Sequence, residues 1–185
     1  TTRSGLLSSP MRDRFGLHCH LELYSEKEIR EILKRSSRIL KIDITEEAAI
    51  TLSSRCRGTP RIANRVLRRC RDVAQVRGNG IIDKIAAEKT LEMLGIDSEG
   101  LDPMDRKILS MVIDKFNGGP VGINTLSAAL NEEQNTIEEV YEPYLIQKGL
   151  LSRTPRGRVA TQIAYQKMQK TIPSSKMLEQ EQFDF

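Results

Sequence analysis

The sequence predicts a mainly α-helical chain divided into two small domains, the second of which carries a β-hairpin. Two observations predict the helices. Apolar residues recur at spacings of three and four through most of the chain, and several of these runs begin at a capping residue and end near a glycine. A third observation predicts the hairpin, because two short stretches flank the turn sequence Pro155-Arg156-Gly157.

The composition is that of a globular protein. Of its 185 residues, 29% are charged and 38% are hydrophobic, and no apolar run approaches the length that spans a membrane. The three cysteines have no metal-ligand spacing, and their odd number suits a reducing cytoplasm. The chain begins without an initiator methionine or an apolar signal core, so we expect a fragment of a longer cytoplasmic protein.

Residues 1–24 predict a basic loop followed by a short strand. Apolar and polar residues alternate from Leu17 to Tyr24, which is the period of a strand with one buried face. His18 and His20 fall on the same face of that strand, but without a third ligand we expect no metal site there.

Residues 25–95 predict four short helices in a compact bundle, which has the size of a lid rather than of an independent enzyme. Ser25 and Glu28 form a capping box at the first helix, and Thr45 caps the second. Asp83 caps the fourth. The apolar residues of this fourth helix that we expect to be buried are Ile85, Ala86, Leu91 and Leu94.

The third helix of this bundle begins at Gly58-Thr59-Pro60-Arg61. Gly58 suits a left-handed position, the Thr59 hydroxyl can cap the helix, and Pro60 stands where a missing N–H costs nothing. Arg61 then falls in the first turn, where a cation is disfavoured by a few tenths of a kcal/mol, roughly, unless an anion is near. A bound phosphate would supply that anion. The alternative is a solvated arginine in an acid-free basic region, whose members are Arg55, Arg57, Arg61, Arg65, Arg68, Arg69 and Arg71.

Residues 98–170 predict three helices and a basic hairpin, which together make a winged-helix domain. Asp102 and Pro103 begin the first helix, and Pro143 is expected to kink the third. Residues 171–185 predict a disordered tail. A winged helix commonly places its third helix in the major groove of DNA. Here that helix carries three acids, which DNA phosphates would repel, so we assign DNA contact to the hairpin. These acids are Glu138, Glu139 and Glu142.

The chain contains no sequence that would by itself hydrolyse a nucleotide. The glycine-rich phosphate loop G-x-x-x-x-G-K-[ST] is absent, and no paired carboxylates, metal cluster or catalytic triad can be assembled from its residues.

Five motifs in order carry a family resemblance: Thr1-Thr2-Arg3-Ser4-Gly5, Met11-Arg12-Asp13-Arg14-Phe15-Gly16, Gly58-Thr59-Pro60-Arg61-Ile62-Ala63-Asn64-Arg65, Gly118-Gly119-Pro120-Val121-Gly122 and Arg153-Thr154-Pro155-Arg156-Gly157-Arg158. They resemble the RuvB family of bacterial AAA+ motors, which drive branch migration of Holliday junctions. The likeness runs from Thr1 to about Lys170. It implies that residues 1–24 end a large ATPase domain, that an AAA+ lid follows, and that the winged helix is a DNA-binding head.

The resemblance also implies a role for several residues toward ATP. Thr2 matches the sensor of the γ-phosphate, and Arg14 matches the arginine finger that acts on the neighbouring subunit's nucleotide, with Arg12 as the weaker choice. Tyr24 resembles the residue that packs on adenine, and Arg61 resembles the second sensor. The Mg²⁺ ligands are expected in the missing N-terminal part.

For the head, Arg153 and Arg158 resemble the family's DNA contacts, with Arg156 at the hairpin tip as a third. The implied partners are duplex DNA at Holliday junctions, five further copies in a homohexamer, the junction-binding protein RuvA and the resolvase RuvC, and no membrane is implied. Two alternatives stay open: a winged-helix DNA-binding regulator without motor activity, or another AAA+ ring ATPase such as a clamp loader or initiator. The ending Gln180-Glu181-Gln182-Phe183-Asp184-Phe185 faintly resembles peptides that dock on the bacterial sliding clamp.

Overall fold

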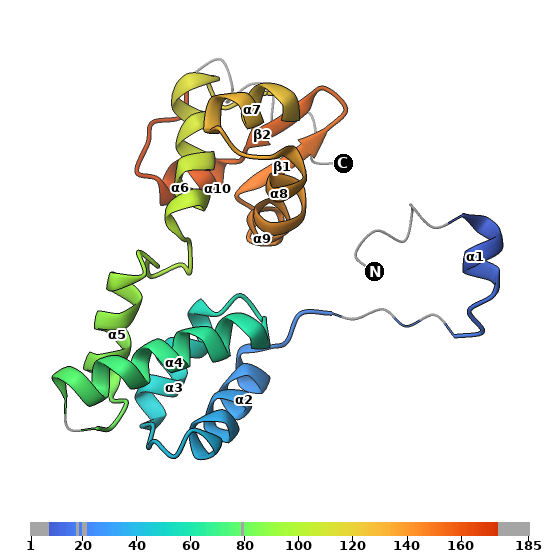
Figure 1. The fold of residues 1–185 in the computed structure, drawn as a ribbon. Helices are drawn as coiled ribbons and strands as arrows, with labels where there is room; N and C mark the ends of the chain where they lie inside the picture. Colours follow the sequence, from blue (N-terminus) through green and yellow to red (C-terminus); the bar gives the residue numbers. More distant parts are fainter. Residues whose placement is uncertain (1–7, 18, 20–21, 79, 174–185) are drawn as a thin grey trace. The chain divides into compact units, whose positions relative to one another are not determined.

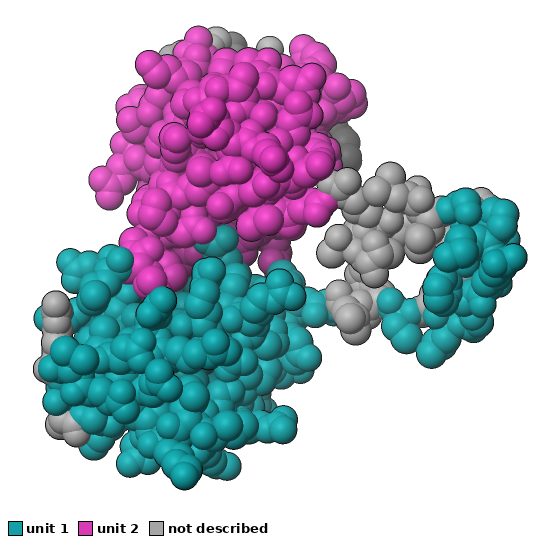
Figure 2. Space-filling view, in the orientation of Figure 1, with its two compact units in different colours: residues 1–93 teal, residues 94–185 magenta. Residues whose placement is uncertain are grey.

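The computed structural model describes residues 8–17, 19, 22–78 and 80–173. The chain divides into two compact units, residues 1–93 and 94–185, which Figure 2 colours separately. Both are mainly helical, as predicted (Figure 1). No helix among the described residues is long and apolar enough to cross a bilayer.

The first unit is a bundle of four helices preceded by a short one. Helix α2 (Glu26–Ile39) packs on α3 (Glu46–Arg55) and on α4 (Pro60–Arg77), and α5 (Lys84–Met93) packs on α3 and α4 (Figure 1). The predicted caps are confirmed at α2, where Ser25 and Glu28 form the capping box, and at α3, where Thr45 Oγ1 accepts from Ala48 N. Asp83 Oδ1 likewise accepts from Ala86 N at 2.8 Å.

Three expectations for this unit are wrong. The described residues between Leu17 and Tyr24 form no strand, because none of the described residues supplies a partner strand, and Leu17 is largely exposed. Part of the loop before them forms the one-turn helix α1 (Ser9–Asp13). Ile85, on α5, is 74% exposed, and Leu94, which follows the end of that helix, is 37% exposed, so the buried face of α5 consists of Ala87, Thr90 and Leu91. His18 and His20 lie outside the described residues.

The second unit has its own core around α6 (Pro103–Ser110). This helix starts at the predicted Asp102 cap and continues as the π-helical turn η2 (Met111–Lys115). Helix α7 (Ile123–Leu130) follows. The third helix is built from α8 (Gln134–Thr136), the π-helical turn η3 (Ile137–Tyr141) and α9 (Glu142–Gln147), so the helix expected to kink at Pro143 carries a π-helical turn just before it.

The predicted hairpin is confirmed and gains a third partner. Strands β1 (Leu151–Thr154) and β2 (Gly157–Ala160) pair antiparallel, and α10 (Gln162–Lys167) follows them. Val121 forms an antiparallel bridge with Arg158 on the other edge of β2. Gly157 is required there, because its φ is +136° and a Cβ would lie 2.5 Å from Val121 O. The glycine-rich motif and the hairpin are therefore one structural unit.

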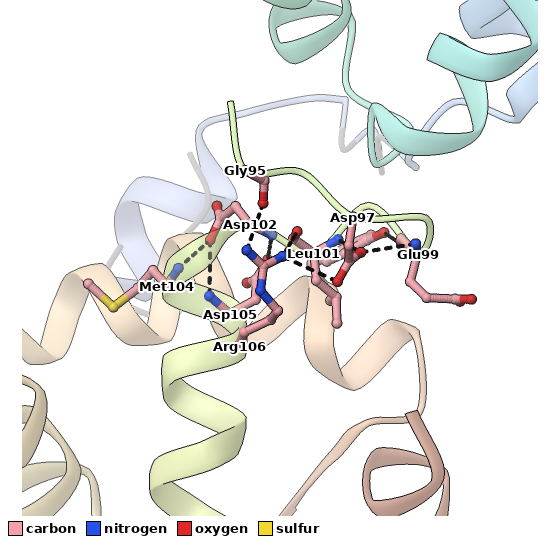
Figure 3. Close-up of polar contacts among 9 residues, drawn as sticks. Gly95, Asp97, Glu99, Leu101, Asp102, Met104, Asp105 and Arg106 are labelled. Carbon is pink, nitrogen blue, oxygen red and sulfur yellow. Dashed lines mark hydrogen bonds and ion pairs between the residues drawn. The ribbon is translucent and has the colours of Figure 1, made fainter. Parts of the chain in front are cut away.

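The segment before α6 is bound to the second unit by Arg106 (Figure 3). Its guanidinium donates from Nη1 to Asp97 Oδ2 at 3.2 Å and to Leu101 O at 2.8 Å, and from Nη2 to Gly95 O at 2.8 Å. Asp97 Oδ1 in turn accepts from Glu99 N and Leu101 N. The residues between 95 and 101 thus belong physically with the winged helix.

We predict that Cys19 is the one cysteine that reacts readily in the folded chain. Cys19 is exposed, whereas Cys56 and Cys70 are buried, and burial raises their pKa values to about 12 and about 11. Iodoacetamide at pH 8 should therefore modify Cys19 quickly and the other two only after unfolding, as mass spectrometry of tryptic peptides can measure. Rapid labelling of Cys56 in the native chain would contradict this packing.

The same thiols should make the fold less stable in alkali. In the unfolded chain they lose their protons near a pKa of about 8.5, while in the folded chain they keep them beyond pH 10. The unfolded state then binds fewer protons, so the free energy of unfolding should fall as the pH rises above about 8.5. Urea unfolding at pH 7 and pH 10 should show a smaller fall in the Cys56→Ala variant than in the Cys19→Ser control.

Candidate phosphate-binding residues

The turn between α3 and α4 brings a cation and an aromatic ring to one place. Arg57 and Gly58 both have left-handed backbones, with φ of +55° and +59°. Thr59 does not cap α4 with its hydroxyl, which corrects the sequence prediction, because Thr59 Oγ1 donates to Arg57 O at 3.1 Å instead. Pro60 takes the predicted first helical position.

Gly58 lies directly against the chain at Tyr24. Tyr24 N donates to Gly58 O at 2.9 Å. A Cβ at Gly58 would lie 2.6 Å from Tyr24 O and 3.0 Å from Leu23 Cβ, so glycine alone fits this approach. Tyr24 and the start of α4 are therefore held at the same turn, three residues from Arg61, and Tyr24 is 47% exposed.

Arg61 is exposed, and no acidic residue stands in the first turn of α4. Arg65 and Arg68 are exposed too, at spacings of four and seven residues, so they continue the same face of the helix. The first turn of a helix carries unpaired N–H groups and a positive partial charge, which oppose a cation and favour an anion. The N–H groups of this turn and the Arg61 side chain are therefore suited to binding a phosphate group.

Arg14 follows α1 directly, and its side chain is exposed. Its backbone N–H donates to Met11 O at 3.3 Å. Thr2, the fourth residue expected at a nucleotide, lies outside the described residues.

The arginines of the hairpin are not equivalent. Arg153 and Arg158 are directly opposite in the register. Arg158 uses its backbone N–H and C=O on Val121, at 2.8 and 3.0 Å, so its pair with Arg153 is one without backbone hydrogen bonds, in which side chains approach most closely. Like charges placed this way repel, and a nearby anion is needed to hold them.

Glutamates of the third helix supply that anion. Arg158 Nε donates to Glu142 Oε1 at 2.6 Å, and Arg158 Nη2 donates to Glu138 Oε1 at 2.6 Å. The Arg158 side chain is 8% exposed and that of Glu142 is 1% exposed. Burial, the largest single influence, lowers the pKa of Arg158, but the hydrogen bonds and charges of Glu142 and Glu138 together outweigh it and raise the pKa. Arg158 therefore stays charged inside the fold.

Arg158 was expected to contact DNA, and this contact stays a prediction. In the folded chain its guanidinium donates to the carboxylates of Glu138 and Glu142, and these ion pairs hold the hairpin on the third helix. Arg153 is 55% exposed and pairs with Glu138 at the surface, and the tip residue Arg156 is exposed as well. The sequence signal for the buried pair was the i, i+4 spacing of Glu138 and Glu142.

Comparisons with known proteins match both predicted domains, the lid and the winged helix. The family model of the RuvB AAA lid domain matches residues 24–97, and that of the RuvB C-terminal winged helix domain matches residues 98–169. The Holliday junction branch migration complex subunit RuvB of Koribacter versatilis is 58% identical over 90% of this chain and 46% of its own length. The protein of the same name from Fusobacterium nucleatum subsp. nucleatum is 55% identical over 92% of this chain and 51% of its own length.

Solved structures give the same match. The Thermotoga maritima RuvB Holliday junction branch migration motor superposes with a TM-score of 0.88 at 48% identity, over 91% of this chain and 57% of that one. The chain thus spans about half the length of the curated relatives it matches.

Breaking the buried ion pair should destabilise the second unit strongly. Arg158→Met keeps most of the packing volume but leaves Glu142 buried without its cation, which we expect to lower the free energy of unfolding by about 3–5 kcal/mol. Arg156→Ala, at the exposed tip, should change it by less than about 0.5 kcal/mol. Chemical unfolding followed by circular dichroism measures both. An Arg158→Met variant as stable as the Arg156→Ala variant would refute the structural role of this pair.

Proposed function

The chain belongs to the RuvB family, and on that premise we propose that the intact protein is an ATP-driven motor that moves Holliday junctions along DNA. The chain would contribute the lid and the DNA-binding head of that motor. The observation that carries the proposal is the match of both domain models in this order, since a regulator would need only the winged helix. Because the chain spans about half of its relatives, we assign the phosphate loop and the Mg²⁺ ligands to the other half.

We propose that ATP binds beside the Gly58 turn. The residues fit: Arg61 is an exposed cation at an acid-free helix start, and the half-exposed Tyr24 ring stands on the same turn. Tyr24 would pack on the adenine ring and Arg61 would bind the phosphates from the lid. Bound ATP supplies a transferable phosphoryl group. Because Arg61 is fixed to α4, its contact with the phosphates would couple the nucleotide to the angle of the lid.

We assign Arg14 to the nucleotide of a neighbouring copy in a homohexamer. Its exposed side chain leaves the guanidinium open to an anion, and the family likeness supports a role toward the neighbouring subunit. A guanidinium is always charged and its planar fork suits the charge that grows on the transferring phosphoryl group. Thr2 is assigned by family likeness to the γ-phosphate sensor.

For the head, we propose that Arg153 and Arg156 bind backbone phosphates of duplex DNA without reading its sequence. Arg158 would act as a positioning residue that fixes the hairpin. Phosphate contacts suit a motor, because they recur at every step along the duplex. By family likeness the further partners are RuvA and RuvC, and the location is the cytoplasm.

The role of Arg14 can be tested in a protein extended to full length. Arg14→Ala should lower the rate of ATP hydrolysis roughly a thousandfold or more, while ATP binds with nearly unchanged affinity, because the arginine acts on the neighbour's nucleotide. Steady-state hydrolysis and a fluorescent ATP analogue measure the two quantities. Arg12→Ala is the matched control and should hydrolyse ATP almost normally. Loss of ATP binding in Arg14→Ala would contradict a role in the neighbouring subunit.

The role of the hairpin can be tested on this chain alone. Arg153→Ala should weaken binding to any duplex and lower the slope of log affinity against log salt by about 1, the loss of one phosphate contact. Fluorescence anisotropy with two unrelated duplexes measures this. Lys167→Ala, an equal charge change on α10, should leave the slope unchanged. If Arg153→Ala affected only one of the duplexes, a sequence-specific regulator would be favoured over a motor.

A further inference from the structure

One carboxylate oxygen of the third helix serves both arginines of the hairpin. Glu138 Oε1 accepts from Arg153 Nη2 at 2.6 Å and from Arg158 Nη2 at 2.6 Å. The two arginines come from opposite positions of β1 and β2, where their charges would otherwise repel. Glu138 therefore occupies the place between two guanidinium groups that a phosphate oxygen could also occupy.

The two contacts of Glu138 differ in how easily they break. Arg158 is 8% exposed and is held by Glu142 as well, so it stays in place without Glu138. Arg153 is 55% exposed, and Glu138 itself is 29% exposed. An ion pair at the surface is weak, since water and salt screen it and two side chains must be ordered to make it. Arg153 is the arginine that can leave.

We propose that Glu138 is a built-in substitute for a DNA phosphate, which holds Arg153 in the free head and releases it to the duplex. The inference rests on the proposed DNA-binding function of the hairpin. On release, Glu138 keeps its bond to Arg158, and Arg153 exchanges one anion for another. Each arginine has an anionic partner before and after the exchange, so the free-energy change of the exchange is small in both directions. A head that must grip and release a duplex repeatedly needs this property.

The proposal predicts that removing the competing carboxylate tightens DNA binding. Glu138→Gln in the 185-residue chain should bind a fluorescent duplex more tightly than Glu139→Gln does, by roughly three- to fivefold, since a surface ion pair is worth up to about a factor of five. Both variants lose one negative charge at adjacent positions of the same helix. The general attraction to phosphates therefore rises equally, and the difference between the two variants reports the contacts of Glu138 with the two arginines of the hairpin.

A double-mutant cycle identifies the partner. In an Arg153→Ala background, the advantage of Glu138→Gln over Glu139→Gln should disappear, because no arginine remains to be released. If the advantage persists, Glu138 does not act through Arg153 and the inference is wrong. If Glu138→Gln binds no more tightly than Glu139→Gln, or more weakly, Glu138 positions Arg153 for DNA instead of competing for it, and the inference is wrong again.

Two further measurements keep these outcomes distinct. Thermal unfolding of each variant shows whether the head is folded. Glu138→Asp keeps the charge but has a shorter side chain that cannot contact both arginines, so it should also tighten DNA binding, and it replaces Glu138→Gln as the test variant if Glu138→Gln does not fold. The proposed function has its own readout in Arg153→Ala. If that variant binds duplex as tightly as the unaltered chain, hairpin binding fails and the inference fails with it. If it binds more weakly while the Glu138 variants show no gain, the inference alone fails.

Discussion

The function of this chain depends on one constraint: a guanidinium group keeps its charge at any ordinary pH and must find an anion or water. Arg106 and Arg158 find carboxylates inside the second unit, and these arginines build the structure. Arg61 has no acid in its helical turn, and this arginine is available to a ligand. Arg153 lies between the two cases, with a carboxylate partner at the surface. The partner of each arginine therefore separates those with a structural role from those proposed to bind a ligand.

Local signals in the sequence predicted the elements well. The capping box at Ser25, the proline starts of two helices and the turn at Pro155 each depend on residues within a few positions, and all are present in the structure. What failed was information that resides in distant partners. The sequence from Leu17 to Tyr24 alternates as a strand does, but the described residues of this stretch form none, because a strand exists only against another strand.

The site was harder to predict than the fold for the same reason. Periodicity placed Ile85 inside, yet α5 contacts its neighbours through a narrower face. Thr59 had a capping side chain, but the left-handed residue before Gly58 offered its carbonyl instead. Arg158 looked like an exposed wing residue because the hairpin is basic, and only the packing of the hairpin on the third helix shows that Glu142 holds it. The sequence shows that Arg158 is charged, but whether its side chain is buried depends on the residues that pack against it in the fold.

The acids on the third helix support the proposal that this winged helix binds DNA through its hairpin. In many winged helices the third helix enters the major groove and reads bases. Here Glu138 and Glu142 are both engaged by arginines of the hairpin, and Glu142 is almost fully buried. The helix face that carries them is used to position the hairpin and cannot also lie in a groove. The basic groups left at the surface can bind phosphates, which every sequence presents alike. A head built in this way gains indifference to sequence at the expense of base recognition, and that exchange suits a motor and not a regulator.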